Sequence, residues 1–468
     1  MRLKDVVFAD ESFRIDAEYF KRNYLAYLYM IHSRGSVKLG DVCHFMIGPF
    51  GSAYDTSNYV EKSDYRYIRG QDVKPFFLTD SESRFMTEQD FIRLQKYALQ
   101  EDDLLVSVVG TLGNACIIYK DELPAIFSCK STAIRANVIN AYFLLAYLNS
   151  KYGRELLLRK ERGAIQMGLN LDDLRSLDIP QFTDSFYSHI EVLIKSAHDK
   201  ISEANGAYHD TEQSLLSELG FASWTPTEES VSEKNCSDFM SAGRFDAEYF
   251  QPKYDELFAL LAKCKVRVLG GKDGLVDIKR SIEPGSGAYS DKGIPFVRIA
   301  DFTEMGVASP EIHIPPELCS DSPRPKKDTI LLSKDGSVGI AYKVEEDLDV
   351  VTSSGILHLT VKDNAVLPDY LTLVLNSKIV RLQAERSAGG SIIQHWKQSE
   401  IENVSIPILP ISSQQKIAAK VRESFALRAE SQRLLDLAKH AVEVAIEQGE
   451  EKAMKTVKCR RKFQSNDN

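Results

Sequence analysis

The feature that most constrains this chain is a seven-residue motif that occurs twice. Residues 14–20 read RIDAEYF and residues 244–250 read RFDAEYF, an offset of 230 positions (244 − 14). Large apolar residues follow both copies at the same spacing: Phe20, Tyr24, Tyr27, Met30 and Ile31 in the first, and Phe250, Tyr254, Leu257, Leu260 and Leu261 in the second. This spacing predicts one apolar face of an amphipathic helix that begins within each motif, around residues 16–33 and 246–264.

The correspondence between the two halves extends well beyond this motif. Matching segments occur in the same order and near the same offset: PFGSAY (49–54) with PGSGAY (284–289), YIRGQDV (67–73) with FVRIADF (296–302), LLVSVVGTLGNACIIY (104–119) with ILLSKDGSVGIAYKV (330–344), YLNSKYGRELL (147–157) with VLNSKIVRLQA (374–384), and GAIQ…LDIP (163–180) with SIIQ…VSIP (391–407). Fixed order at a near-constant offset indicates tandem duplication of a whole domain.

A long amphipathic helix is predicted at the end of each half. Apolar residues in the first recur in steps of mostly three and four, a heptad pattern, and Gly220 stands just past its end as a C′ glycine should. At 1.5 Å per residue each helix would extend roughly 50 Å. The simplest way to cover both apolar stripes is to pack them on each other. The alternative is that each helix covers its own domain.

The expected fold class is therefore α+β. Two tandem-duplicated, β-rich domains with short helices are separated by two long antiparallel coiled-coil helices. The predicted boundaries are an N-terminal amphipathic arm at 1–35, a first β-rich domain at 36–183, a long spacer helix at 184–220, a linker at 221–243, a repeat of the arm at 244–264, a second β-rich domain at 265–411, a second spacer helix at 412–450, and a basic, disordered tail at 451–468.

Composition limits the class of protein. The chain has a formal net charge of −9, and its seven cysteines show no C-x-x-C spacing, which argues against both a disulfide framework and a zinc site. Net acidity does not favour a protein that coats nucleic acid, but charge around a local groove still permits DNA binding. The chain begins without an apolar signal-like segment and has no run of transmembrane length. We therefore expect a cytoplasmic protein without membrane contact.

Motifs for catalysis are missing from the sequence. There is no [DN]-P-P-[YFW] segment of an amino-methyltransferase, no P-loop, no H-E-x-x-H and no G-x-S-x-G. A dispersed nuclease site made of acidic residues and a lysine stays open, because its spacing is loose. We predict no catalytic residue, no metal site and no cofactor in this chain.

The duplicated segments resemble the specificity subunit (S subunit, HsdS-like) of type I restriction-modification systems. The most specific stretch is the I-P…P…Q…I-A pattern of the second half, formed by Ile406, Pro407, Pro410, Gln415, Ile417 and Ala418. The first half departs from it in IPQFTDSFYSHIEVLI, which lacks the second proline and the glutamine. The resemblance covers nearly the whole chain.

The resemblance implies a non-catalytic, sequence-specific DNA-binding subunit. Its two β-rich domains would be target-recognition domains that each read one half of a split, asymmetric site in double-stranded DNA. It also implies partner subunits: a methyltransferase that uses S-adenosylmethionine, and a restriction subunit that translocates DNA with ATP and Mg²⁺. Two alternatives remain: a fused restriction enzyme with an unrecognised catalytic site, and a stand-alone DNA-binding regulator or anti-restriction adaptor.

Candidate DNA-reading residues are polar side chains in the Gly-rich loops, because such side chains can reach base edges or phosphates. In the first domain they are Ser52, Tyr54, Asn58, Arg69, Gln71, Lys130, Gln166 and Asn170. In the second domain they are Ser286, Tyr289, Arg298, Lys334, Ser337, Gln394, His395 and Lys397. The alternative for each is a role in a turn or a helix cap.

Two of these candidates, Arg69 and Arg298, occupy equivalent positions in the two halves. They are therefore expected to serve the shared scaffold or the phosphates. Base-specific contacts should lie where the halves differ, as residues 55–58 differ from 291–293. These differences predict two unlike half-sites.

Overall fold

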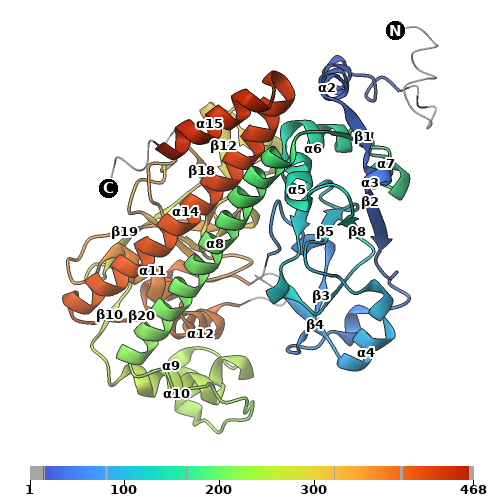
Figure 1. The fold of residues 1–468 in the computed structure, drawn as a ribbon. Coiled ribbons are helices and arrows are strands. Elements are labelled where there is room, and N and C mark those ends of the chain that lie inside the picture. The colour runs from blue at the N-terminus through green and yellow to red at the C-terminus, as the bar shows by residue number, and fades with distance from the viewer. Residues whose placement is uncertain are drawn as a thin grey trace. The chain divides into compact units, whose positions relative to one another are not determined.

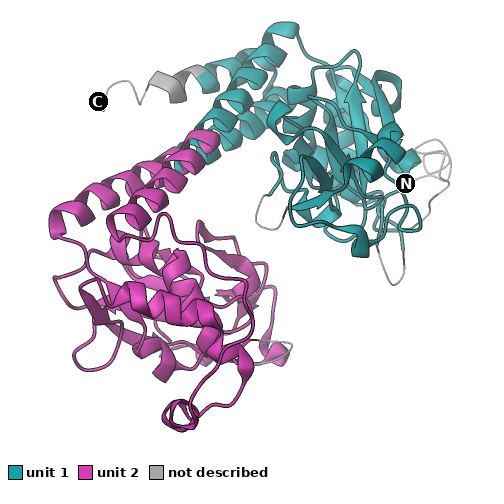
Figure 2. Cartoon of the chain, turned by 90° about the horizontal axis from the view of Figure 1, so that it is seen from below, with its two compact units in different colours: residues 1–200, 429–468 teal, residues 201–428 magenta. Residues whose placement is uncertain are grey.

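The computed structural model describes residues 14, 16–79, 83–163, 167–320, 322–389 and 394–462. They form β-rich domains with short helices and two long helices, the α+β class expected from the sequence (Figure 1). The chain divides into two compact units: residues 1–200 with 429–468 form unit 1, and residues 201–428 form unit 2 (Figure 2). Each unit therefore contains one β-rich domain and one part of each long helix.

The β-rich domain of unit 1 is built on three small sheets. A four-stranded antiparallel sheet has the order β2-β8-β5-β6, and a three-stranded sheet has the order β4-β3-β7, in which β3 and β7 are parallel. A third sheet pairs β1 with β9. The strands are β1 (Ser36–Lys38), β2 (Cys43–Ile47), β3 (Tyr65–Ile68), β4 (Arg84–Met86), β5 (Leu104–Ser107), β6 (Ala115–Ile117), β7 (Ala125–Phe127), β8 (Ser131–Ala136) and β9 (Asp178–Pro180).

Unit 2 repeats this topology strand by strand. Its sheets have the orders β11-β19-β16-β17, β15-β12-β18 and β10-β20, and the parallel pair recurs between β12 and β18. A hairpin of β13 (Phe302–Thr303) and β14 (Gly306–Val307) is additional. The shared strands are β10 (Val266–Val268), β11 (Val276–Arg280), β12 (Ile294–Val297), β15 (His313–Ile314), β16 (Ile330–Ser333), β17 (Ala341–Lys343), β18 (Val351–Thr352), β19 (Ile356–Val361) and β20 (Ser405–Pro407). The tandem duplication is confirmed.

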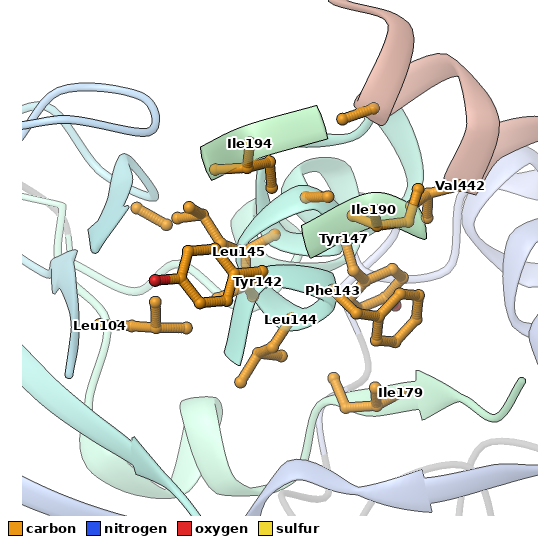
Figure 3. Packing of buried hydrophobic residues seen from close by; sticks show 14 of the residues in the cluster. Leu104, Tyr142, Phe143, Leu144, Leu145, Tyr147, Ile179, Ile190, Ile194 and Val442 are labelled. Carbon is orange, nitrogen blue, oxygen red and sulfur yellow. The ribbon is translucent and has the colours of Figure 1, made fainter. Parts of the chain in front are cut away.

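A short apolar helix fills the centre of each unit. In unit 1, α5 (Ala141–Asn149) is buried at every residue from 142 to 148, as an all-round apolar helix must be. Its side chains pack with Leu104 and Ile179 of the strands and with Ile190 of a long helix (Figure 3). Its counterpart in unit 2, α11 (Pro368–Asn376), is buried in the same way.

The other helices are short and lie around these centres. They are α2 (Arg22–Ser33), α3 (Leu39–Val42), α4 (Glu88–Arg93), α6 (Lys151–Leu158), α7 (Leu171–Arg175), α9 (Cys236–Ala242), α10 (Pro252–Leu261), α12 (Lys378–Ser387), α13 (Gln398–Glu402) and α15 (Glu450–Lys462).

The two long helices are α8 (Asp184–Glu218) and α14 (Ile411–Gln448). Ser431 Oγ of α14 donates to Ala197 O of α8 at 2.7 Å, and Ser424 Oγ donates to Ala204 O at 2.8 Å. From Ala197 to Ala204 the chain of α8 advances by seven residues, while the partner on α14 changes from Ser431 back to Ser424. The two helices are therefore antiparallel. The apolar stripes pack on each other and also on the domain cores, which combines the two arrangements considered above.

The sequence pattern predicted that the arm helix begins within the repeated motif. In the structure α2 starts only at Arg22, after the motif has ended. Instead, the Tyr19 ring contacts two guanidinium groups, with Arg159 Cζ 3.7 Å and Arg14 Cζ 4.6 Å from its centre. Arg159 is buried and its Nε donates to Tyr19 O at 2.6 Å. Cation–π contacts are strongest where water is excluded. The motif therefore anchors the arm to the end of α6.

The second copy of the motif makes the same contacts. The centre of the Tyr249 ring lies 4.0 Å from Arg386 Cζ and 4.7 Å from Arg244 Cζ. Arg244 in turn pairs with Asp246 at 2.7 Å. The hydrogen bonds from this guanidinium group hold the pKa of the Asp246 carboxyl below its usual value. A structural role in both units explains why the chain contains the motif twice.

Each arm also reaches the end of a long helix. Arg34 Nε donates to Ile446 O at 2.9 Å, and its Nη2 donates to Glu447 O at 3.0 Å, near the C-terminus of α14. In unit 2, Cys264 Sγ lies 3.6 Å from Leu219 O at the end of α8. These contacts occupy carbonyl groups that have no partner within the helix. The arm of each repeat thus caps the long helix of the other repeat.

Two segments differ from the sequence prediction. The tail expected to be disordered from residue 451 continues as helix α15 through Lys462. The linker at 221–243 contains α9. Within the described residues, no helix is long and apolar enough to cross a membrane.

Replacing Ala438 with leucine tests the close packing of the long helices. Ala438 is fully buried on α14, in the core that includes Ile190 and Leu193 of α8. The added volume is expected to lower the free energy of unfolding by about 1–3 kcal/mol. Denaturant unfolding measures this change, with A426L at an exposed position of the same helix as the control. If A438L and A426L had the same free energy of unfolding, close packing of the two long helices at Ala438 would be contradicted.

Burial of His358 predicts that unit 2 is sensitive to acid. Desolvation lowers the pKa of His358 to about 4, and its Nε2 lies 2.8 Å from Thr352 Oγ1. Because the folded pKa is below the unfolded value, this residue destabilises unit 2 as the pH falls from about 6.5 toward 4, by about 3 kcal/mol. H358Q should remove this part of the pH dependence in denaturant unfolding. An unchanged pH profile would show that His358 is not the cause.

Candidate nucleic-acid interface

Several loops of unit 1 gather at one end of its sheets. The end of β2 pairs with the start of β8 (Ile47 with Thr132), and the end of β5 does the same (Ser107 with Ser131). Ser128, between β7 and β8, donates from its backbone N to Ile68 O at the end of β3, at 2.9 Å. The loops that meet there, which we call loop surface 1, are 48–54, 69–72, 108–113, 128–130 and 167–170.

Arg69 and Asp72 form a largely buried ion pair within loop surface 1. Arg69 Nη2 lies 2.7 Å from Asp72 Oδ1, and Arg69 N donates to Asp72 Oδ2 at 2.8 Å. Arg298 and Asp301 repeat the pair in unit 2 at 3.0 Å. Because each guanidinium group is engaged by its own turn, the geometry favours the scaffold role considered for both arginines.

Lys130 and Gln71 are exposed beside this turn. Lys130 Cβ lies so near Gly70 that a Cβ at that glycine would be 2.8 Å away. The Lys130 ammonium group forms no hydrogen bond or ion pair with the described part of the chain. When the Gln71 amide is oriented with its oxygen toward Arg69, that oxygen accepts a hydrogen bond from Arg69 Nη1 at 3.2 Å. Lys130 is thus well placed to meet a phosphate.

The candidates in the loop at 48–54 and in the short helix at 56–58 differ in exposure. Ser52 and Asn58 are exposed, whereas Tyr54 is buried against Tyr59 and Tyr67. The Tyr54 hydroxyl donates to Asn58 O at 3.0 Å, and burial raises its pKa to about 12. Tyr54 therefore supports the loop. Contrary to the prediction, its buried side chain is not positioned to read a base.

The remaining two candidates of the first domain are Gln166 and Asn170. Gln166 lies outside the described residues. Asn170 is exposed but caps α7: its Oδ1 accepts from Asp173 N at 2.8 Å. This is the capping role that was the alternative for such residues.

Unit 2 forms the equivalent surface from different side chains. Here β11, β12, β16 and β18 end, and β19 begins, at one end of the sheets. Ser353 N donates to Val297 O at 2.8 Å, and Lys334 N donates to Gly355 O at 2.9 Å. The loops that meet there, which we call loop surface 2, are 281–289, 298–301, 334–339, 353–355 and 394–397.

A charged cluster occupies the centre of loop surface 2. His395 Nδ1 lies 2.8 Å from Asp335 Oδ1, and the Lys334 ammonium pairs with the other Asp335 oxygen. Gly336 N donates to Gln394 O at 2.9 Å, which joins the two loops. The corresponding bridge in unit 1 joins Val109 with Gly168, which carry no polar side chain. Asp335 was not among the residues predicted from the sequence. The sequence did contain a sign of it, because the matched loops differ there: Val109 stands where the second half has Asp335.

The other candidates of the second domain are exposed to different degrees. Ser286 and Ser337 are exposed in Gly-rich turns. The exposed fraction of Tyr289 is 36%, in contrast to its buried counterpart Tyr54. Lys397 is exposed and precedes α13, where its backbone N donates to Glu400 Oε2 at 3.1 Å. No group of His, Cys, Asp and Glu within the described residues could hold a metal ion.

The comparisons with known proteins identify one domain within the chain. Residues 274–433 match the family model described as "Type I restriction modification DNA specificity domain". No curated protein matches the chain significantly.

Solved structures with a similar course of the chain were found as well. One is the S subunit of a type I restriction-modification system from M. genitalium, at 13% identity and a TM-score of 0.35, covering 90% of this chain and 95% of that one. Another is an HsdS subunit from Thermoanaerobacter tengcongensis, at 17% identity and a TM-score of 0.28, covering 88% and 96%. A third, from work on complex assembly and conformational transition of the type I R-M system, has 18% identity and a TM-score of 0.29, covering 88% and 97%.

The matched region contains the whole of loop surface 2. Residues 274–433 therefore belong to the family of type I restriction modification DNA specificity domains.

Removing Lys130 tests whether loop surface 1 contacts DNA phosphates. K130A is expected to weaken binding to all DNA sequences about equally, and to reduce the slope of log K against log salt by about 1. Binding titrations at several salt concentrations measure both effects. K120A is the matched control, because Lys120 is exposed beyond the end of β6, at the opposite end of the same sheet. Equal losses for both variants would contradict a contact at this surface.

Proposed function

We propose that this specificity subunit reads a bipartite, asymmetric DNA site, with loop surface 1 on one half-site and loop surface 2 on the other. The observation that carries the proposal is that the two surfaces have the same backbone framework and different side chains. Asp335 and His395 occupy the positions of Val109 and Gly168. Donors and acceptors at equivalent places differ, so the two domains would prefer different bases.

We propose further that α8 and α14 act as the spacer between the two reading domains. Both helices continue through the boundary between unit 1 and unit 2. Ser–Ala hydrogen bonds and buried alanines pair them closely on both sides of that boundary. A rigid spacer would fix the number of base pairs between the half-sites, because a helix has a set rise per residue.

Methylation and cleavage would then be carried out by partner subunits. We propose a methyltransferase subunit that binds S-adenosylmethionine and a restriction subunit that uses ATP and Mg²⁺, in a complex that acts in the cytoplasm. This chain would supply only recognition. The complete lack of methyltransferase and P-loop motifs in its sequence supports this division of roles.

Mapping methylated adenines across a genome tests the proposed function. The chain is co-expressed with the methyltransferase subunit of its own system in an unmodified host. We expect one split, asymmetric motif with a fixed gap. H395A combined with S337A should change the bases of one half only and leave the gap intact, with a loss of roughly 1–3 kcal/mol of discrimination per contact.

Two results would contradict this proposal. A palindromic or undivided motif would exclude two unlike reading surfaces. A stable complex that methylates nothing would favour the stand-alone regulator, and DNA cleavage by the purified chain alone would favour the fused enzyme.

A further inference from the structure

We propose that Phe50 is an aromatic wedge that inserts between stacked base pairs of the half-site read by loop surface 1. This inference rests on the proposed function and adds a residue that sequence reasoning did not single out. The exposed fraction of Phe50 is 67%, and it stands in the turn that directly follows the end of β2. An exposed aromatic residue on a reading surface can gain burial only from a partner.

The loop that carries Phe50 is held firmly from below. Phe50 O accepts from Ala53 N at 2.8 Å, which closes the turn, and Ala53 O accepts from Arg93 Nη1 at 2.9 Å. Tyr54 fixes the far side of the loop by its buried ring and its hydrogen bond to Asn58 O. An apolar side chain on a braced turn loses little conformational entropy when it binds.

The near side of the loop is equally constrained. A Cβ at Gly48 would lie 2.6 Å from Phe127 O and from the backbone of Ser128. The chain therefore runs directly against the 128–130 turn that presents Lys130. Phe50 thus belongs to a surface that also offers a free ammonium group, the combination by which wedge residues and phosphate contacts cooperate on bent DNA.

Exposed apolar residues are common singly and by themselves indicate nothing. Val138 illustrates this: its exposed fraction is 82%, but it follows the end of β8 at the opposite end of the same sheet. Phe50 differs because it lies among the convergent loops and on a braced turn. Position, rather than exposure, singles it out.

The wedge is expected in one half-site only. The residue of unit 2 that corresponds to Phe50 is Gly285, in the matched pair PFGSAY and PGSGAY. Gly285 has φ +75°, a conformation that side-chain-bearing residues rarely adopt. Insertion would therefore distort the DNA on one side of the bipartite site, which adds shape readout to that half alone.

The test uses the full chain in complex with its methyltransferase subunit and DNA of the mapped motif. A 2-aminopurine base is placed in turn at each step of both half-sites. Unstacking by an inserted ring increases its fluorescence. Apart from the adenines that the methyltransferase subunit turns out of the duplex, the wild-type complex should brighten one step of one half-site. F50A should lose that signal, bind about ten-fold or more weakly, and relax the motif at the adjacent positions.

Two further variants separate the wedge from a general loss of structure. F50W retains a stacking ring and should preserve both the signal and the affinity. V138A removes an apolar side chain that is more exposed than Phe50, and it should behave as wild type. All three variants should unfold at the wild-type midpoint, because neither position is buried.

The outcomes distinguish this inference from the proposed function. If the wild-type complex gives a split motif but no step besides the methylated adenines brightens, or if F50A keeps the motif and the affinity, the wedge is refuted and the two reading surfaces stand. Replacing thymine with uracil in the DNA removes the 5-methyl group of the base. If this replacement alone accounts for the affinity that Phe50 provides, Phe50 contacts a thymine methyl group and insertion is refuted. Weakened binding of F50A to the methyltransferase subunit, with an unchanged motif, would assign Phe50 to a protein interface. No split motif with the wild type would refute both proposals.

Discussion

The close antiparallel packing of α8 against α14 is the interaction on which the rest of the structure depends. Alanines and serines at the contact let the two backbones approach, and Ser424 and Ser431 use the short distance to donate to carbonyl groups across the interface. Each helix also lends part of its apolar stripe to a domain core. A loosened helix pair would therefore expose both cores, so the two long helices and the domains are stabilised together.

Duplication has separated the interactions that hold the domains together from the loop surfaces that we propose to read DNA. Equivalent positions keep the interactions that build the framework: the Arg–Asp turn pairs, the tyrosine with its guanidinium neighbours, and the order of the strands. The side chains at the loop ends have diverged, as Asp335 and His395 show against Val109 and Gly168. Framework residues satisfy each other internally, whereas loop residues face outward and are free to vary.

Much of the fold could be predicted from the sequence, because the repeat fixed two domains and the heptads fixed two paired helices. The start of α2 could not be predicted from the sequence, because the DAEYF segment is held by contacts with Arg159, which is distant in sequence. Tyr54 and Asn170 look like free polar residues until burial and capping are seen. The Asp335–His395 contact also joins distant segments. Helicity of the tail was missed because its charge pattern resembles that of a solvated terminus.

The arms have a consequence for inheritance. Arg34 reaches the end of α14 and Cys264 the end of α8, so each repeat is completed by the other repeat's helix. Half of the gene would encode an arm, a β-rich domain and a long helix, but not the helix that its arm contacts in this chain. Recombination between the two repeated stretches, or with those of a related gene, would exchange one β-rich domain while keeping the contacts between the arms and the long helices. The proposed reading surfaces could thus change by the exchange of a whole domain rather than by slow substitution.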